Sequence, residues 1–240
     1  MVKLKNNQPE IFFMKYSNFQ TIDFSRNKRI VRLILMFSAI TFMAGFTSCS
    51  GLIFGMYGMK KPKPVDEITI ARYAGKYNIP PADLYIMDTS YVTWLLAKDT
   101  SLYKWEIHNH YQPLQALYYN QKGELVSFQV NCYAGGFPNL QWERDSIFTA
   151  FPPLEQTKVD SLMSLRKLLT FILPTANSKP IEVEGLDYFV VVQWNRFMGR
   201  QSKRLIRIVQ QNSLLAEDVN VRIIYVNTDN NFAFATIEKK

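Results

Sequence analysis

The sequence predicts an α/β body, a mixed sheet with flanking helices, and its second half carries the clearest evidence. Residues 188–194, Tyr-Phe-Val-Val-Val-Gln-Trp, form an almost continuous apolar run, which is typical of a strand buried on both faces of a sheet. A helix is predicted at 199–211 and a second buried strand at 221–227. Strand, helix and strand in this order form a βαβ unit, in which the two strands are parallel and the crossover is right-handed.

The elements before this unit are predicted from periodicity and from turn residues. Asp66 is a good N-cap for a first helix, and Gly123 supplies the positive φ that a hairpin turn at 120–123 needs. Apolar residues at helical spacing, with Pro174 beyond their end, predict a longer helix. The predicted elements are helices at 66–77, 91–98 and 157–173 and hairpin strands at 114–119 and 124–133.

Composition favours one folded domain after an N-terminal leader. The chain has 240 residues, of which 48% are hydrophobic and 14% aromatic, enough for one substantial core. Residues 1–49 hold seven Lys or Arg and two acidic residues, so the remaining chain carries 21 basic and 18 acidic residues. Because most of the net charge of +8 belongs to the leader, no nucleic-acid partner is predicted for the body.

The leader has the layout of an export signal. A basic stretch at 26–32 precedes an apolar core at 33–46, and the small residues Thr47 and Ser48 lead into Cys49. This arrangement resembles a bacterial lipoprotein signal, with Phe46 standing where Leu is usual. The resemblance implies cleavage before Cys49 and attachment of lipid to that cysteine. The segment before the basic stretch is unusually long, and Met14 is an alternative start.

The alternative interpretation of the leader is an uncleaved transmembrane helix. Residues 33–59 are 27 residues without a charge, long enough to cross the ~30 Å hydrocarbon core of a bilayer. Glycines interrupt its second half, which favours the lipoprotein signal. Both interpretations hold the body at a membrane of the cell envelope, and we expect it to face the periplasm. The predicted organisation is a signal or anchor at 1–49, a basic proline-containing linker at 50–65 and a folded domain at 66–240.

The βαβ unit resembles part of the thioredoxin fold. A buried strand ends in Trp194, a short loop opens a helix, and the next strand ends in Val226-Asn227-Thr228-Asp229. The resemblance covers residues 114–229 loosely and 187–229 more closely. It implies a thioredoxin-like mixed sheet, with the head of the helix at the position of the redox motif.

Two departures from the thioredoxin pattern decide what the resemblance implies for activity. Thioredoxins carry Trp-Cys-Gly-Pro-Cys where this chain has Phe197, Met198, Gly199, Arg200 and Gln201. Thiol–disulfide exchange needs a thiolate to attack and a second thiol to resolve, and neither Met nor Gln provides one. The final hairpin that closes a thioredoxin is also missing, because the chain stops 11 residues after Asp229. The motif therefore predicts a redox-inactive relative.

Other chemically capable residues are few. Cys132 ends a strand-like run and is either a small buried hydrophobe or a reactive thiol. His108 and His110 would share one face of a strand and could ligate a metal, but no further ligands stand at a recognised spacing, so polar loop residues are the simpler interpretation. The acids Glu143, Asp145 and Asp160 are scattered. No metal, cofactor or catalytic residue is predicted.

The best candidate surface is a cationic stripe on the helix after the βαβ loop. Arg200, Lys203, Arg204 and Arg207 fall at positions i, i+3, i+4 and i+7, which share one side of a helix. Such a stripe could hold a phosphate, an acidic peptide or anionic lipid headgroups, or it could be an ordinary solvated face.

These observations lead to a functional expectation and two alternatives. We expect a membrane-anchored, redox-inactive binding or scaffold protein with an envelope protein as its partner. The first alternative is a thiol-dependent protein that uses Cys132. The second is a truncated relative that has lost its function.

Overall fold

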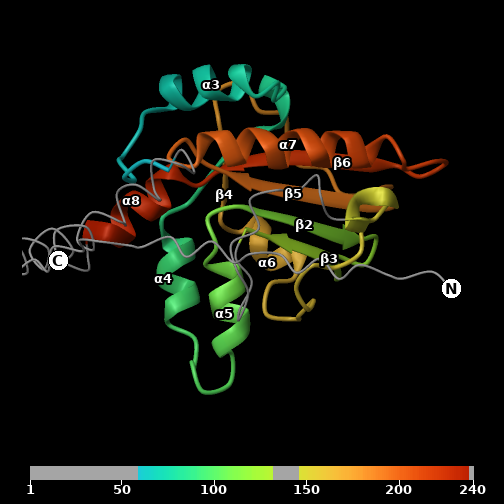
Figure 1. The fold of residues 1–240 in the computed structure, drawn as a ribbon, viewed down its shortest axis with the longest axis horizontal. Helices are drawn as coiled ribbons and strands as arrows, with labels where there is room; N and C mark the ends of the chain where they lie inside the picture. Colours follow the sequence, from blue (N-terminus) through green and yellow to red (C-terminus); the bar gives the residue numbers. More distant parts are fainter. Residues whose placement is uncertain (1–58, 132–145, 238–240) are drawn as a thin grey trace, which may run out of the picture. The chain divides into compact units, whose positions relative to one another are not determined.

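The computed structural model describes residues 59–131 and 146–237, and they form one mixed six-stranded sheet with helices on both faces (Figure 1). The strand order is β3–β2–β5–β6–β1–β4. The strands are β1 (Leu84–Met87), β2 (Gln115–Asn120), β3 (Leu125–Val130), β4 (Ile172–Pro174), β5 (Tyr188–Trp194) and β6 (Val221–Asn227). The helices are α3 (Glu67–Lys76), α4 (Ser90–Leu96), α5 (Lys104–His110), α6 (Leu165–Leu169), α7 (Gly199–Ser213) and α8 (Asp229–Ile237).

The predicted βαβ unit is confirmed. β5 and β6 pair in parallel from Tyr188 opposite Val221 to Trp194 opposite Asn227, and α7 connects them. All but the first residue of β5 are buried, as its apolar run predicts. β1 lies parallel to the other side of β6, so β5, β6 and β1 form the parallel centre of the sheet.

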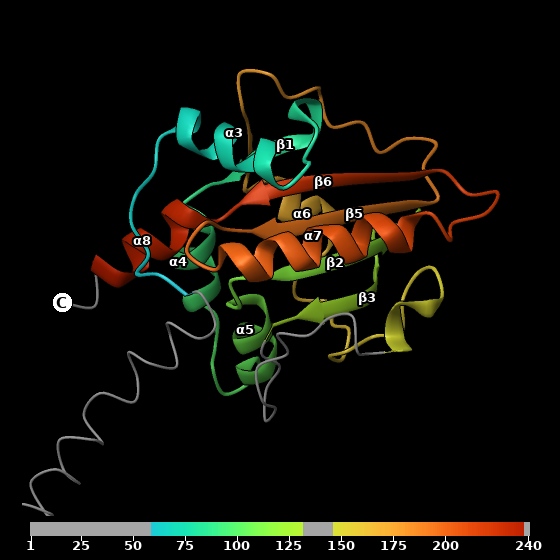
Figure 2. The ribbon, with the colours of Figure 1, turned by 45° about the horizontal axis from the view of Figure 1, so that its top comes forward.

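Successive side chains of the central strands point to opposite faces of the sheet and pack into two separate hydrophobic cores. Val190, Val192 and Trp194 point to the face that α3 and α7 cover, and there they meet Leu205 and Val209 of α7. The other face of the sheet packs against α4, α5, α6 and α8 (Figure 2). The apolar run of β5 is continuous because both of its faces are covered.

The predicted hairpin is also confirmed. β2 and β3 pair antiparallel, and β2 pairs antiparallel with β5 along its other edge. The turn closes with a hydrogen bond of 2.8 Å from the N–H of Gly123 to the carbonyl oxygen of Asn120, and Gly123 has φ +74°. This positive φ is the conformation that glycine adopts without strain.

The prediction of a helix at 157–173 is wrong for most of its length. Only α6 is helical there, and β4 follows it. Asp160 Oδ1 accepts from the N–H of Leu162 at 2.9 Å, a local turn that competes with a helical backbone. The N–H of Thr157 donates to the carbonyl oxygen of Phe128 on β3. The apolar residues counted as one helical stripe therefore reach the core from irregular chain.

The two helices predicted near the start of the body are present. Asp66 caps α3, accepting from the N–H of Thr69 at 2.7 Å. The helix predicted at 91–98 is α4. β1, α5, β4 and α8 are not predicted from the sequence, because each is short or lacks strong periodicity. Within residues 59–131 and 146–237, no helix has the length and apolar character needed to cross a bilayer.

The first turn of α7 lies against the end of α3. A Cβ on Gly199 would stand 2.5 Å from Tyr77 Oη, closer than non-bonded atoms approach. Tyr77 is buried and meets Trp194 edge to face, with ring centroids 5.5 Å apart. Gly199 therefore permits the close packing that fixes the head of α7.

Candidate functional site

The carboxyl ends of β5 and β6 form the place where an open α/β sheet usually binds ligands. From β5 the chain continues to α7 on one face of the sheet, and from β6 it continues to α8 on the other. Ligands of such sheets bind in the crevice between two neighbouring strands whose connections diverge in this way.

Polar side chains at this edge bond to the protein itself. Asn195 Oδ1 accepts from the N–H of Met198 at 2.8 Å, and Asn195 Nδ2 donates to the carbonyl oxygen of Pro113 at 2.8 Å. Asp229 Oδ2 accepts from the N–H of Arg196 at 2.8 Å and from Asn227 Nδ2 at 2.9 Å. These contacts fix the loop that leads into α7.

Asp229 is an unusual carboxylic acid because it is almost fully buried. Burial raises its pKa above the ordinary value of an aspartate, although hydrogen bonds from Asn227 and from the N–H of Arg196 favour the charged form. Since Asp229 Oδ1 has no partner in the described part of the chain, ionisation opposes folding at this position. Asp229 positions the loop and lies too deep for a surface binding group.

The two positions that the proposed thioredoxin resemblance aligns with cysteines are occupied by buried side chains. Met198 is 3% exposed and belongs to the core under α3 and α7, and Gln201 is 2% exposed. Reactive thiols of oxidoreductases are partly exposed and ionisable. Met198 and Gln201 are neither exposed nor ionisable thiols.

The predicted cationic stripe lies along the outer side of α7. Arg200, Lys203, Arg204 and Arg207 together line an open hollow of about 360 Å³. Arg204 is half-buried and the other three are exposed. The opposite side of the helix, with Leu205, Ile206 and Val209, is fully buried. The structure therefore brings the four cations together at the surface.

The basic linker runs from the head of α7 to α8. The N–H of Lys60 donates to the carbonyl oxygen of Phe197 at 2.7 Å. At the other end of the linker, the N–H of Val65 donates to Asn230 Oδ1 at 2.8 Å, and Asn230 Nδ2 donates to the carbonyl oxygen of Val65 at 3.1 Å. The described chain, which starts at residue 59, thus begins beside the cationic stripe.

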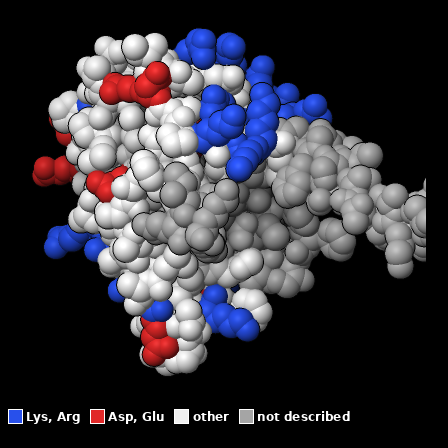
Figure 3. Space-filling view, turned by 90° about the vertical axis from the view of Figure 1, so that its left-hand side faces the viewer, with Lys and Arg blue, Asp and Glu red and all other residues white. Residues whose placement is uncertain are grey.

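Helix α3 adds further cations next to the linker. Arg72, Lys76 and Arg196 surround the ring of Tyr73, with their charged groups 5.7, 5.0 and 5.9 Å from its centroid. Cations at these distances are attracted by the electron-rich face of the ring. Figure 3, which faces this end of the molecule, shows Lys and Arg side chains gathered on one part of its surface.

The two histidines lie on a helix and do not share a face. α5 contains both, and at i, i+2 on a helix their side chains diverge by about 200°. His108 is exposed and His110 is buried, so the strand and loop interpretations were both wrong. Among the described residues, no group of three or more His, Cys, Asp and Glu could hold a metal ion.

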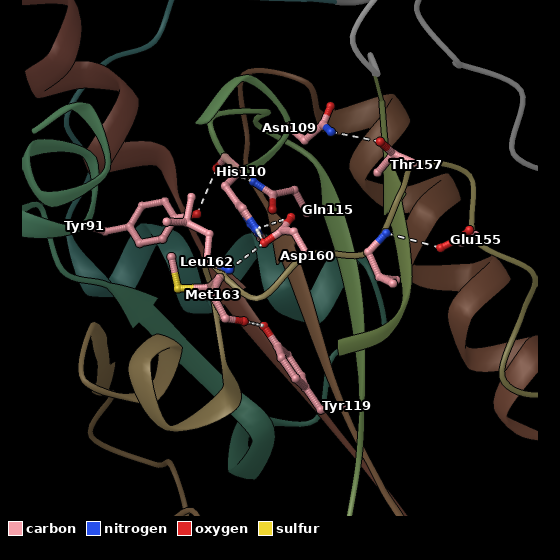
Figure 4. Close-up of polar contacts among 11 residues, drawn as sticks. Tyr91, Asn109, His110, Gln115, Tyr119, Glu155, Thr157, Asp160, Leu162 and Met163 are labelled. Carbon is pink, nitrogen blue, oxygen red and sulfur yellow. Dashed lines mark hydrogen bonds and ion pairs between the residues drawn. The ribbon is translucent and has the colours of Figure 1, made fainter. Parts of the chain in front are cut away.

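The structure pairs His110 with Asp160, which the sequence analysis did not foresee (Figure 4). His110 Nε2 lies 3.1 Å from both carboxylate oxygens, and the ring stacks on Phe128 with centroids 4.7 Å apart. The carbonyl oxygen of His110 accepts from Tyr91 Oη at 2.8 Å and from Gln115 Nε2 at 2.7 Å. The cluster ties α4, α5 and β2 to the irregular segment before α6.

The geometry of this pair does not favour catalysis. A histidine held by a carboxylate acts as a base only when its other ring nitrogen reaches a substrate or nucleophile. His110 Nδ1 is buried and has no hydrogen-bond partner in the described residues. Asp160 borders a hollow of about 650 Å³ beside the hairpin turn, but it turns both oxygens towards His110. The pair is a structural contact.

The predicted leader at 1–49, which includes Cys49, lies outside the described residues, and so do Cys132, Glu143 and Asp145. The lipidation of Cys49 and the reactivity of Cys132 stay predictions.

Comparison with known proteins gives no functional assignment: no family model, curated protein or solved structure matches this chain.

Proposed function

We propose that the chain is a membrane-anchored protein of the cell envelope whose thioredoxin-like, redox-inactive body binds a partner. The observation that carries this proposal is the set of side chains at the head of α7. Buried Met198 and Gln201 stand where an oxidoreductase would hold its thiols, and a stripe of four cations begins beside them. The helix thus lacks the groups for electron transfer and presents positive charges that suit an anionic surface.

The thioredoxin-like character is supported by the arrangement around β5. The parallel strands β5 and β6 end in Trp194 and Asn227, α7 connects them, and a hairpin lies antiparallel beside β5. The hairpin precedes the βαβ unit in this chain, whereas the hairpin that closes a thioredoxin follows it. The proposed relationship is therefore one of fold type, with a different order of elements.

The membrane anchor is supported by the sequence of the leader. The basic stretch, the apolar core and Cys49 have the order of a lipoprotein signal. Such a protein would face the periplasm, where a redox-inactive binding domain serves to recruit or position an envelope protein.

A disulfide-reduction assay tests the redox part of the proposal. In the presence of dithiothreitol, the full chain is expected to leave the rate of insulin reduction unchanged, because no thiol stands at the head of α7. A thioredoxin of known activity is the positive control.

The same assay separates the alternatives. Acceleration that the variant Cys132→Ser abolishes would replace the proposal with a thiol-dependent protein. Acceleration that survives this substitution would show a catalytic group other than Cys132 and would also overturn it.

A further inference from the structure

The modest net charge of the body conceals a strong segregation of charge. The linker with α3 (residues 59–77) and the loop with α7 (residues 195–213) contain ten Lys or Arg and two acidic residues, a net charge of +8. The rest of residues 50–240 carries 11 basic and 16 acidic residues, a net charge of −5. We call the surface formed by these two segments the tether face.

The tether face is continuous in space. α3 and α7 cover the same face of the sheet, and Tyr77 at the end of α3 touches the first turn of α7. Arg196 of the loop and Arg72 and Lys76 of α3 lie around one tyrosine ring. Lys60, Lys61 and Lys63 of the linker are exposed beside them. The cations therefore act on a partner as one field.

The position of the linker identifies the partner. Because Lys60 bonds to Phe197 and Val65 bonds to Asn230, the described chain begins at the tether face, and this is the junction to which the sequence of the leader leads. A membrane that holds the leader lies near this junction. Anionic headgroups attract basic residues close to a bilayer surface, while the net negative remainder of the body is repelled by them.

We propose that the tether face docks on anionic lipid headgroups of the membrane that holds the leader, so that α3 and α7 face the bilayer and the hairpin side faces away. This inference rests on the proposed membrane anchor. Each Lys or Arg near the surface contributes about fivefold to the docking equilibrium. The attraction weakens as salt shortens the screening length from about 8 Å at 0.15 M to about 3 Å at 1 M.

Lysine acetylation of the full chain in lipid nanodiscs tests the proposal. Two bilayers are compared, phosphatidylcholine alone and phosphatidylcholine with phosphatidylglycerol, and the modification of each lysine is read by mass spectrometry. We expect slower acetylation of Lys60, Lys61, Lys63 and Lys203 in the anionic bilayer only. Lys104, Lys122 and Lys158, which lie away from the tether face, should react equally in both, and 1 M salt should remove the difference.

Charge variants provide the matched control. Arg200→Gln with Arg207→Gln removes two surface cations from the tether face and should weaken docking about 25-fold, on the fivefold contribution of each cation. Lys158→Gln with Arg166→Gln removes two exposed cations elsewhere and should leave the protection of Lys60 and Lys203 unchanged.

The possible results separate docking from anchoring. A chain that enters nanodiscs but shows equal lysine reactivity in both bilayers would overturn docking while supporting the proposed membrane anchor. An acidic protein would then be the partner that the tether face binds. A chain that does not enter nanodiscs would refute the anchor. Docking is then measured by adding that chain to preformed vesicles, where equal binding to neutral and anionic vesicles would overturn it.

Discussion

Replacing His110 by alanine is expected to destabilise the folded body by about 2–5 kcal/mol, because it removes a buried hydrogen-bond partner and a large part of a buried ring. The side chain of His110 is fully buried and that of Asp160 is 10% exposed, so the substitution leaves a buried carboxylate without its ring partner. It also opens a cavity where the ring stacks on Phe128. Thermal or urea unfolding followed by circular dichroism measures the loss.

The second histidine of α5 is the natural control. His108 is exposed, so His108→Ala should change the free energy of unfolding by no more than about 0.5 kcal/mol. A double-mutant cycle of His110→Ala and Asp160→Ala then isolates the pair, and residues in direct contact typically show a coupling energy of about 0.5–3 kcal/mol. Equal, small effects of both histidine substitutions would contradict the structural role of the His110–Asp160 pair.

Replacing Gly199 by alanine is expected to destabilise the body by about 1–3 kcal/mol, the usual range for overpacking a filled site. The added Cβ would meet Tyr77 Oη at 2.5 Å, and the ring of Tyr77 is held by its contact with Trp194. Either the head of α7 or the end of α3 has to move. Chemical unfolding of the variant and the parent chain under the same conditions measures the change.

Two further variants make this expectation specific to the contact. Gly75 lies in α3 with nothing within 4 Å of an added Cβ, so Gly75→Ala should stabilise the body by about 0.5–1 kcal/mol. Tyr77→Phe removes the hydroxyl that obstructs the Cβ and should recover part of the stability lost in Gly199→Ala. If Gly199→Ala were as stable as Gly75→Ala, the close packing of α3 against α7 would be wrong.

The elements that sequence reasoning predicted correctly are those whose local signals agree with their tertiary role. β5 is buried on both faces, so its apolar run is unbroken, and Asp66 caps α3 through a contact three residues away. The hairpin turn needs only Gly123 and its neighbours. Short-range chemistry is sufficient in these places because the long-range contacts require the same residues.

The segment at 157–173 shows where such reasoning stops. Its apolar spacing fits a helix, but Thr157 bonds to the edge of β3 and Asp160 turns towards His110. These partners lie about 30 and 50 residues earlier in the chain, and no local pattern indicates them. Tertiary contacts override helix propensity here. Because these contacts join residues far apart in the sequence, the His110–Asp160 pair could not be predicted from local patterns.

The candidate surface was only partly readable from the sequence. The spacing of Arg200, Lys203, Arg204 and Arg207 predicts one helix side, and these four side chains line a common hollow. The contributions of Lys60, Arg72 and Lys76 depend on the linker and α3 lying beside α7, which spacing cannot reveal. A summed charge of +3 for residues 50–240 hid the tether face because the acidic residues lie elsewhere in the fold.

Whether Cys49 holds the body at a membrane is tested by the intact mass of the protein purified from membranes of a bacterium that processes lipoproteins. We expect a product that begins at Cys49 and is heavier than the bare chain by its acyl groups. A full-length mass without lipid would contradict the lipoprotein signal. It would make residues 33–59 a membrane-spanning helix and give the residues before them a cytoplasmic role.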